Sequence, residues 1–212
     1  MPTKDNIRHF SHRTFGIVPA AGESRRMGED KLLLPWDGGT VIGAVIRAWR
    51  SAGVENVVAV PHPANEALIA HLQTYDIDVV VPVHPPAEMK HTVQRALEHI
   101  DQTYAPHEND AWLLAPADMP TLSPEAIRAV IGTASDSSES VVPTHLGRQG
   151  HPVLLRWRLR DEVTRLTVGN GINTLLERDD VRRVECGPAA VANDVDTPDD
   201  YRKALAKLRG AP

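Results

Sequence analysis

The sequence is poor in several features, and each absence restricts what the protein can be. It contains one cysteine, Cys186, which excludes an internal disulfide and a zinc site built on cysteines. No apolar run approaches the roughly 20 residues that a helix needs to cross a bilayer. Basic residues number 23 against 28 acidic ones, and the net charge of -5 gives nucleic-acid binding no electrostatic support. We therefore expect neither a membrane nor a nucleic acid as a partner.

The N-terminal stretch lacks the apolar run of a secretory signal and carries Lys4, Arg8 and Arg13 instead. We predict that residues 1–13 form a mobile leader and that the protein is cytoplasmic. With 42% hydrophobic and 24% charged residues, the chain has the composition of a folded globular protein. Its length of 212 residues suits one ample core, so residues 14–212 are expected to form a single domain.

Short apolar runs alternate with segments of helical period along most of the chain. Most runs are rich in Val, Ile and Leu without polar alternation, which is typical of strands covered on both faces. Strand–helix alternation implies right-handed crossovers and a mainly parallel sheet. We therefore predict an α/β fold: a single-domain, three-layer α/β/α, Rossmann-like, doubly wound and mostly parallel sheet with a small β-hairpin. The expected strands are Thr14–Pro19, Asn56–Val60, Asp78–Val83, Ala111–Ala115, Ser140–Pro143, Pro152–Leu155 and Val181–Glu185. The expected helices are Thr40–Ala52, Asn65–Thr74, Thr92–Ile100, Ser123–Ala134 and a last one from Thr197-Pro198 to about Leu208. The hairpin is expected between the fifth and sixth strands, at residues His145–His151.

The loop from Ala20 to Lys31 follows the first strand, where ligands bind in an open parallel sheet. Small residues at Ala20, Ala21 and Gly22 let backbone N–H groups approach a ring or a phosphate, and Arg26 and Lys31 add positive charge. The segment lacks Gly-Lys-Ser/Thr, which excludes a P-loop, and it lacks Gly-x-Gly-x-x-Gly, which excludes the dinucleotide fingerprint. We favour a phosphate site over a surface loop whose glycines only make turns.

Acidic residues follow an apolar strand and precede the last helix. Asp118 ends the run that begins at Ala111, so it should project at the same sheet edge as the first loop, either as an oxygen ligand for Mg²⁺ or as the cap of a turn. Residue types alone leave these two readings near even. On an extended chain Asp194 and Asp196 would point to one side, where one of them can complete a metal site.

Four segments carry a resemblance to the molybdenum cofactor nucleotidyltransferase family. The loop resembles its signature of two small residues and Gly, then Ser-x-Arg-Met-Gly-x-x-Lys and a Leu-rich run, here Leu32-Leu33-Leu34-Pro35. Ala117-Asp118-Met119-Pro120 is similar to Gly-Asp-Met-Pro, residues 193–200 are similar to Asp-hydrophobic-Asp-Thr-Pro-Glu-Asp, and residues 147–154 are similar to Gly-Arg-x-Gly-His-Pro-Val-Leu. The double alanine before Gly22 resembles the cytidylyltransferase branch. The resemblance spans Gly16 to about Leu208.

The resemblance implies roles for particular residues. Arg26, Lys31 and Asp118 would be catalytic, and Asp118 would hold the metal with Asp194, which we favour narrowly, or Asp196. Arg148 and His151 would lie on the acceptor side, although a structural role for His151 is favoured. The nucleotide would be bound by Ala20, Ala21, Gly22, Glu23, Ser24, Arg26, Lys31 and Thr92. The chain departs from the family at Glu88 and Lys90, where small residues are usual, and at Gly169-Asn170-Gly171, where an Arg is missing.

The expected reaction is a Mg²⁺-dependent transfer of CMP from CTP to the phosphate of a molybdopterin, with release of pyrophosphate. The alternatives are a guanylyltransferase, a nucleotidyltransferase for another phosphorylated acceptor such as a sugar phosphate, and a non-catalytic NTP-binding regulator. The expected partners are the small-molecule substrates and a recipient molybdoenzyme or its chaperone.

Overall fold

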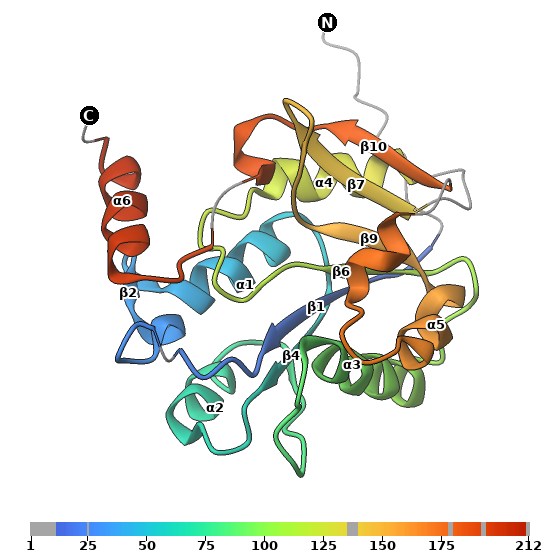
Figure 1. Cartoon of the computed structure of the whole chain (residues 1–212), viewed down its shortest axis with the longest axis horizontal. Helices are drawn as coiled ribbons and strands as arrows, with labels where there is room; N and C mark the ends of the chain where they lie inside the picture. The colour runs from blue at the N-terminus through green and yellow to red at the C-terminus, as the bar shows by residue number, and fades with distance from the viewer. Residues whose placement is uncertain (1–11, 25, 135–139, 178–179, 192–193, 211–212) are drawn as a thin grey trace, which may run out of the picture.

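A computed structural model describes residues 12–24, 26–134, 140–177, 180–191 and 194–210 (Figure 1). Apart from His12 and Arg13, the expected leader lies outside these residues. The strands are β1 (Thr14–Ala20), β2 (Pro35–Trp36), β3 (Gly39–Thr40), β4 (Asn56–Pro61), β5 (Asp78–Val79), β6 (Ala111–Leu114), β7 (Ser140–His145), β8 (Arg148–Gln149), β9 (Val153–Arg156) and β10 (Val181–Glu185). The helices are α1 (Val41–Ser51), α2 (Glu66–Leu72), α3 (Met89–Tyr104), α4 (Pro124–Thr133), α5 (Arg160–Arg165) and α6 (Pro198–Leu208).

The main sheet has the strand order β10-β7-β9-β6-β1-β4-β5, with β8 paired to β7. β1 is parallel to both of its neighbours, β4 and β6, and β7 is parallel to β10. Only β9 among the strands of that order runs antiparallel to its neighbours, β6 and β7. The predicted α/β fold with a mostly parallel sheet is therefore confirmed, and β2 and β3 form a small separate sheet that the sequence did not indicate.

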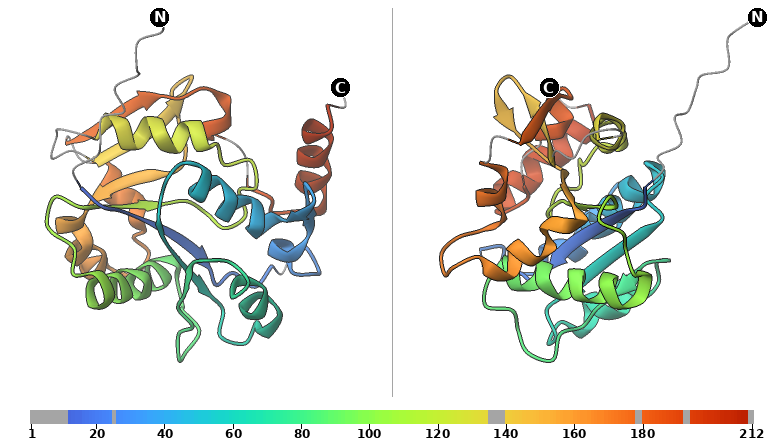
Figure 2. Two further views of the ribbon diagram at one scale, coloured as in Figure 1. Left: turned by 180° about the vertical axis from the view of Figure 1, so that it is seen from behind. Right: turned by 90° about the vertical axis from the view of Figure 1, so that its right-hand side faces the viewer.

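Helices cover both faces of this sheet (Figures 1 and 2). On β1, Phe15 and Ile17 belong to the core cluster that includes the apolar side of α3. Val18 belongs to the opposite cluster with α1, and Gly16 faces the same side, since a Cβ there would lie 3.3 Å from Trp49. This alternation is the period of two of a strand buried on both faces. It confirms the predicted three layers.

Side-chain caps begin the helices where the sequence predicted them. Thr40 Oγ1 accepts a hydrogen bond from the Gly43 N–H at 3.1 Å, and Ser123 Oγ accepts one from Ala126 at 3.2 Å. Before α6, Thr197 Oγ1 accepts from the Asp200 N–H at 3.2 Å, while the Asp200 carboxylate accepts from the Thr197 N–H at 2.9 Å. Each bond satisfies a backbone N–H group that has no partner within its own helix.

Several elements differ from the sequence prediction, the third strand and α3 by the most, and α5 was not predicted. The third strand ends at Val79 rather than at Val83, and Pro82, which has no N–H to donate to a ladder, follows shortly after it. α3 begins at Met89 rather than at Thr92, with Glu88 as its N-cap. The Glu88 N–H donates to His91 Nδ1 at 3.2 Å, which supports a helix start three residues earlier than expected.

The predicted hairpin is present as β7 and β8, joined at Leu146 and Gly147. Both residues have positive φ, 50° and 77°, as a tight two-residue turn requires. Gly150, just after the hairpin, lies against another segment, because a Cβ built on it would be 1.9 Å from the Ala190 carbonyl oxygen.

Replacing Gly150 with alanine should therefore destabilise the fold. The neighbouring atom is backbone, so the two segments must separate, at a cost of about 1–3 kcal/mol or more for such overpacking. Urea unfolding followed by tryptophan fluorescence measures this loss. Gly132→Ala is the matched control, because nothing lies within 4 Å of a Cβ there. Equal stability of the two variants would contradict the close approach.

Arg13 lies at the edge of the expected leader and is attached to the sheet domain. Its guanidinium forms an ion pair with the buried Asp110 at 2.9 Å, and its backbone N–H donates to the same carboxylate at 2.8 Å.

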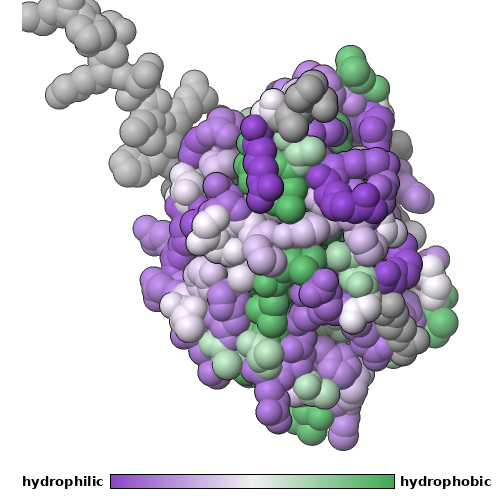
Figure 3. Space-filling view, turned by 90° about the vertical axis from the view of Figure 1, so that its left-hand side faces the viewer, coloured by the Kyte–Doolittle hydropathy of each residue, from purple (hydrophilic) through white to green (hydrophobic). Residues whose placement is uncertain are grey.

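The face shown in Figure 3 is largely polar, with small separated apolar areas. Within the described ranges, no helix combines the length and the apolar character that crossing a bilayer demands.

Candidate active site

A cavity of about 480 Å³ opens at the carboxyl ends of β1, β4 and β6. One wall is the loop after β1, another is the first turn of α3 with the segment before it, and the third is the segment after β6. Of the residues predicted for the site, the cavity is lined by Ala20, Ala21, Gly22, Glu23, Lys31, Thr92 and Asp118. The expectation that the first loop and Asp118 share one sheet edge therefore agrees with the geometry.

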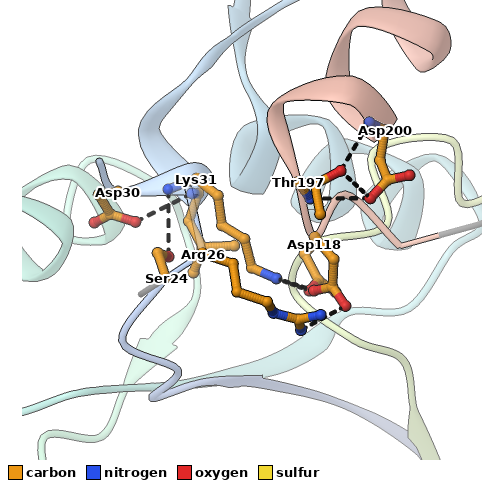
Figure 4. Close-up of polar contacts among 9 residues, drawn as sticks. Ser24, Arg26, Asp30, Lys31, Asp118, Thr197 and Asp200 are labelled. Atoms are coloured by element: carbon orange, nitrogen blue, oxygen red, sulfur yellow. Dashed lines mark hydrogen bonds and ion pairs between the residues drawn. The ribbon is translucent and has the colours of Figure 1, made fainter. Parts of the chain in front are cut away.

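Lys31 stands between two carboxylates at this edge. Its ammonium donates to Asp118 Oδ2 (Figure 4) and, at 2.7 Å, to Asp196 Oδ1. Burial alone would lower the pKa of Lys31, but the hydrogen bonds to the two carboxylates outweigh that effect and raise it. Lys31 is therefore held as a cation, and it ties the signature loop to two distant parts of the chain.

Local hydrogen bonds explain why Lys31 occupies this position. Asp30 begins the short helical turn Lys31–Leu33, and its Oδ1 accepts from the Leu32 N–H at 3.1 Å. Its Oδ2 accepts from the Asn65 side chain at the start of α2, at 2.7 Å. Ser24 Oγ accepts from the Lys31 N–H at 3.3 Å. The loop is thus fixed on both sides of its lysine.

The C-terminal acidic segment is joined to the end of β6 through its backbone. The Val195 N–H donates to the Asp118 carbonyl at 3.0 Å, and the Val195 side chain is buried. Asp196 is the acid that shares Lys31 with Asp118, and the hydrogen bond from Lys31 holds the pKa of Asp196 below its ordinary value. Asp194, which the sequence favoured narrowly, forms no hydrogen bond or ion pair with Lys31 within the described part of the chain, where the carboxylate partners of Lys31 are Asp118 and Asp196. The geometry thus shifts the preference for a second ligand toward Asp196.

Carboxylate charge accumulates at this point. Desolvation, reinforced by the charges of Asp118 and Asp196, raises the pKa of Asp194 to about 6. Within the described part of the chain, no group of three His, Cys, Asp or Glu residues has the arrangement of a metal site. Oxygen donors are nevertheless the ligands that Mg²⁺ and Mn²⁺ take, and the cation between Asp118 and Asp196 is the Lys31 ammonium. The donor set fits a divalent ion.

Arg26 and Ser24 lie beside the main cavity rather than in its wall. The Arg26 guanidinium forms an ion pair with Asp196 Oδ2 at 2.8 Å and is 70% exposed. Ser24 has a positive φ of 49° and lines a second hollow of about 220 Å³ together with Gly22, Glu23, Asp30, His62, Ala64 and Asn65. Both residues of the signature thus border the site from the solvent side.

Sequence reasoning missed several residues of the cavity wall. His62 directly follows β4, whose last residue, Pro61, pairs in register with Ala20. The Nε2 atom of His62 lies 4.0 Å from a carboxylate oxygen of Glu23. The parallel pairing of neighbouring strands was the signal for His62, because it brings their carboxyl ends to one edge. The other missed lining residues are Pro19, Leu32, Pro85, Pro86, Ala87, Glu88, Met89, Pro116 and Ala117.

The two residues expected on the acceptor side, Arg148 and His151, lie in different environments. Arg148 is exposed on β8 and does not line the cavity. His151 is partly buried, its Nδ1 lies 3.3 Å from the Leu114 carbonyl oxygen at the end of β6, and burial lowers its pKa. A neutral histidine in contact with the strand that carries Asp118 agrees with the structural role that the sequence favoured.

Comparisons with known proteins agree with this geometry. The family model described as MobA-like NTP transferase domain matches residues 16–184. The chain is 28% identical over 186 residues to the molybdenum cofactor cytidylyltransferase of Escherichia coli K12, covering 87% of this chain and 92% of that protein. It is 25% identical over 134 residues to a probable molybdenum cofactor guanylyltransferase of Bacillus cytotoxicus, covering 63% of each.

A solved structure is also similar. The manganese complex of Rv0371C from Mycobacterium tuberculosis H37Rv superposes with a TM-score of 0.73 at 28% identity, covering 91% of this chain and 98% of that one. The family match spans the signature loop and Asp118, which line the cavity, and also the β7–β8 hairpin, which does not. The chain belongs to the family of proteins with a MobA-like NTP transferase domain, and it is a nucleotidyltransferase by that membership.

Proposed function

We propose that this nucleotidyltransferase is Mg²⁺-dependent and transfers CMP from CTP to the terminal phosphate of a molybdopterin, releasing pyrophosphate. The observation that carries the proposal is the position of Lys31, held between Asp118 and Asp196 at the edge of a cavity walled by Ala20 to Glu23. A lysine and two carboxylates at the opening of a cavity with a small-residue wall suit a nucleoside triphosphate accompanied by a divalent ion.

Different residues of the site would bind the nucleoside, the phosphates and the metal ion. The backbone of Ala20, Ala21 and Gly22 leaves room for the nucleoside, because nothing lies within 4 Å of a Cβ built on Gly22. Lys31 and Arg26 supply positive charge for the triphosphate and for the pyrophosphate that leaves. Asp118 and Asp196 would hold the ion, which supplies neutralisation of phosphate charge at the reacting centre.

The transfer itself needs little acid–base chemistry from the protein. An oxygen of the acceptor phosphate attacks the α-phosphorus of CTP, a new phosphorus–oxygen bond forms, and the bond to the β-phosphate oxygen breaks. A phosphate nucleophile is already ionised at neutral pH, so catalysis rests on positioning and charge stabilisation. His151 does not line the cavity and contacts the Leu114 carbonyl instead, so it is not placed to act as a base there.

The choice of CTP and of molybdopterin rests on likeness to relatives. The Escherichia coli relative is named for cytidylyl transfer and the Bacillus relative for guanylyl transfer, and both names specify the molybdenum cofactor. The double alanine at Ala20 and Ala21 favours the cytidylyl branch. We place the reaction in the cytoplasm, where its nucleotide substrate is made, and expect a recipient molybdoenzyme or its chaperone to take the product.

Pyrophosphate release tests the proposal. The protein is incubated with Mg²⁺ and each of CTP, GTP, UTP and ATP, with molybdopterin, with a sugar phosphate or without acceptor. We expect release with CTP and molybdopterin only. Release with GTP would make the protein a guanylyltransferase, and release with a sugar phosphate would change the acceptor. Nucleotide binding without release under any condition would favour a non-catalytic regulator.

A further inference from the structure

Lys90 is a charged residue in an unusual position, because it is only 4% exposed. It lies in the first turn of α3, and its ammonium donates to the Thr167 carbonyl at 2.6 Å. The same ammonium lies 3.2 Å from Glu88 Oε2. Burying an ammonium group costs free energy unless the group is paired and hydrogen-bonded. The contacts with Thr167 and Glu88 therefore allow Lys90 to be buried.

The pairing fixes the carboxylate of Glu88 at the wall of the cavity. Glu88 lines the cavity next to Met89 and near Thr92, a buried residue one turn further along α3. Lys31 and Asp118 line the same cavity from the β1 and β6 edges. If the triphosphate lies against Lys31 and Asp118, the base is directed away from them, toward the wall that α3 provides.

We infer that Glu88 selects the base of the nucleotide, by accepting a hydrogen bond from an exocyclic amino group. This inference rests on the proposed function, because it assumes that the cavity holds a nucleoside triphosphate. An ionised carboxylate can only accept hydrogen bonds. The N4 amino group of cytosine is a known partner of Glu and Asp side chains. Uracil has a carbonyl oxygen in that place, and this oxygen would face the carboxylate without a proton between them.

Lys90 is a positioning residue in this arrangement and does not touch the base. Its ammonium holds the Glu88 carboxylate in place, and its second bond, to the Thr167 carbonyl, joins the pair to the segment that follows α5. The Glu88 side chain also accepts a hydrogen bond from the backbone N–H of His91 in the capping box that begins α3, and its two oxygens together still have lone pairs left for a ligand. A site built to bond an amino group rejects the analogue that lacks it, because its own polar group would be left without a partner.

Equilibrium binding of CTP and UTP, measured by calorimetry with Mg²⁺ and without acceptor, tests the inference. The two nucleotides have the same ring size and the same phosphates, so their affinity ratio isolates the base edge. We expect the unmodified protein to bind CTP at least about tenfold more tightly than UTP, within the range for one good base contact. Glu88→Gln should bring the ratio close to one, because an amide can donate to the uracil oxygen as well as accept from cytosine.

Two further variants separate base selection from a general structural effect. Glu98→Gln, on the same helix and paired with Arg95 at the surface, should leave the ratio unchanged. Lys90→Met, which keeps the length of the buried side chain, should lower the ratio, because it frees the Glu88 carboxylate to move. A merely structural Glu88 would weaken CTP and UTP binding alike.

An unchanged ratio in a folded Glu88→Gln protein, or an unmodified protein that binds both nucleotides equally, would overturn the inference. The proposed function fails separately. Selective binding that Glu88→Gln removes, without pyrophosphate release with any acceptor, would leave the inference standing and reject the transferase. Absence of nucleotide binding would reject both.

Discussion

Replacing Lys31 with alanine should lower kcat/KM for nucleotidyl transfer by about a hundredfold to a thousandfold. That is the usual loss when one preorganised donor to a developing negative charge is removed. Lys31 supplies the only ammonium that meets Asp118 and Asp196 among the described contacts, and in the proposed reaction its charge stabilises the leaving pyrophosphate. Steady-state pyrophosphate release measures the effect, with thermal unfolding as the check on folding.

Lys203→Ala is the matched control for this variant. Lys203 also forms a short ion pair, 2.6 Å from Asp199, but it is exposed on α6 and does not line the cavity. Its loss should leave kcat/KM within twofold. Near-normal turnover of Lys31→Ala would remove the signature loop from the reaction.

Replacing Lys31 should strengthen the binding of a divalent metal ion when no nucleotide is present, although it weakens catalysis. Without nucleotide, the Lys31 ammonium neutralises the two carboxylates that would hold the ion. Lys31→Met removes this charge and keeps most of the side-chain volume. Mn²⁺ should therefore bind the variant at least about tenfold more tightly, which corresponds to the interaction of one pair of unit charges at a partly exposed site. Electron paramagnetic resonance of free Mn²⁺ measures the affinity. Unchanged or weaker binding of Mn²⁺ by the variant would mean that Asp118 and Asp196 do not hold the ion.

Asp118→Asn should abolish Mg²⁺-dependent turnover, with a loss of about a thousandfold or more. An amide keeps the shape of the side chain but not the charge, and a hard divalent ion depends on carboxylate oxygens. The substitution also removes one of the two carboxylates proposed to hold the ion, so binding of Mn²⁺ should weaken together with the rate.

The control for that variant is Asp199→Asn, an exposed carboxylate in the first turn of α6. It should leave both the rate and the affinity for Mn²⁺ unchanged, at a small cost in helix stability. Titration of the rate with Mg²⁺ makes the comparison. An Asp118→Asn protein with an unchanged metal response would exclude Asp118 from the metal site.

The sequence was sufficient for the main sheet and for the part of the cavity wall that the loop after β1 and Asp118 form, because local signals specify them. Buried strands such as β1 and β6 appear as apolar runs, and caps such as Ser123 and Thr197 mark where helices begin. Parallel strands end at one edge, which was enough to bring the loop after β1 and Asp118 together. Each of these predictions depends on a few neighbouring residues.

The remaining features depend on contacts between residues far apart in the chain. The bonds from Lys31 to Asp118 and Asp196 span 87 and 165 residues, and no local pattern shows that one lysine joins both acids. The burial of Lys90 is also non-local, since its partner Thr167 is 77 residues away. A charged residue in a helix is ordinarily predicted to be exposed, so the sequence could indicate Glu88 and Lys90 as departures but not as an ion pair in which the lysine is buried.

Transfer of label from CTP carrying ³²P at the α-phosphate to molybdopterin, with Mg²⁺, is the most direct test of the proposed reaction. We predict that the label moves into a product whose mass is that of the acceptor plus CMP, with one pyrophosphate released for each label transferred. Label that stays in CTP, or that appears only as free CMP, would contradict a nucleotidyl transfer to this acceptor.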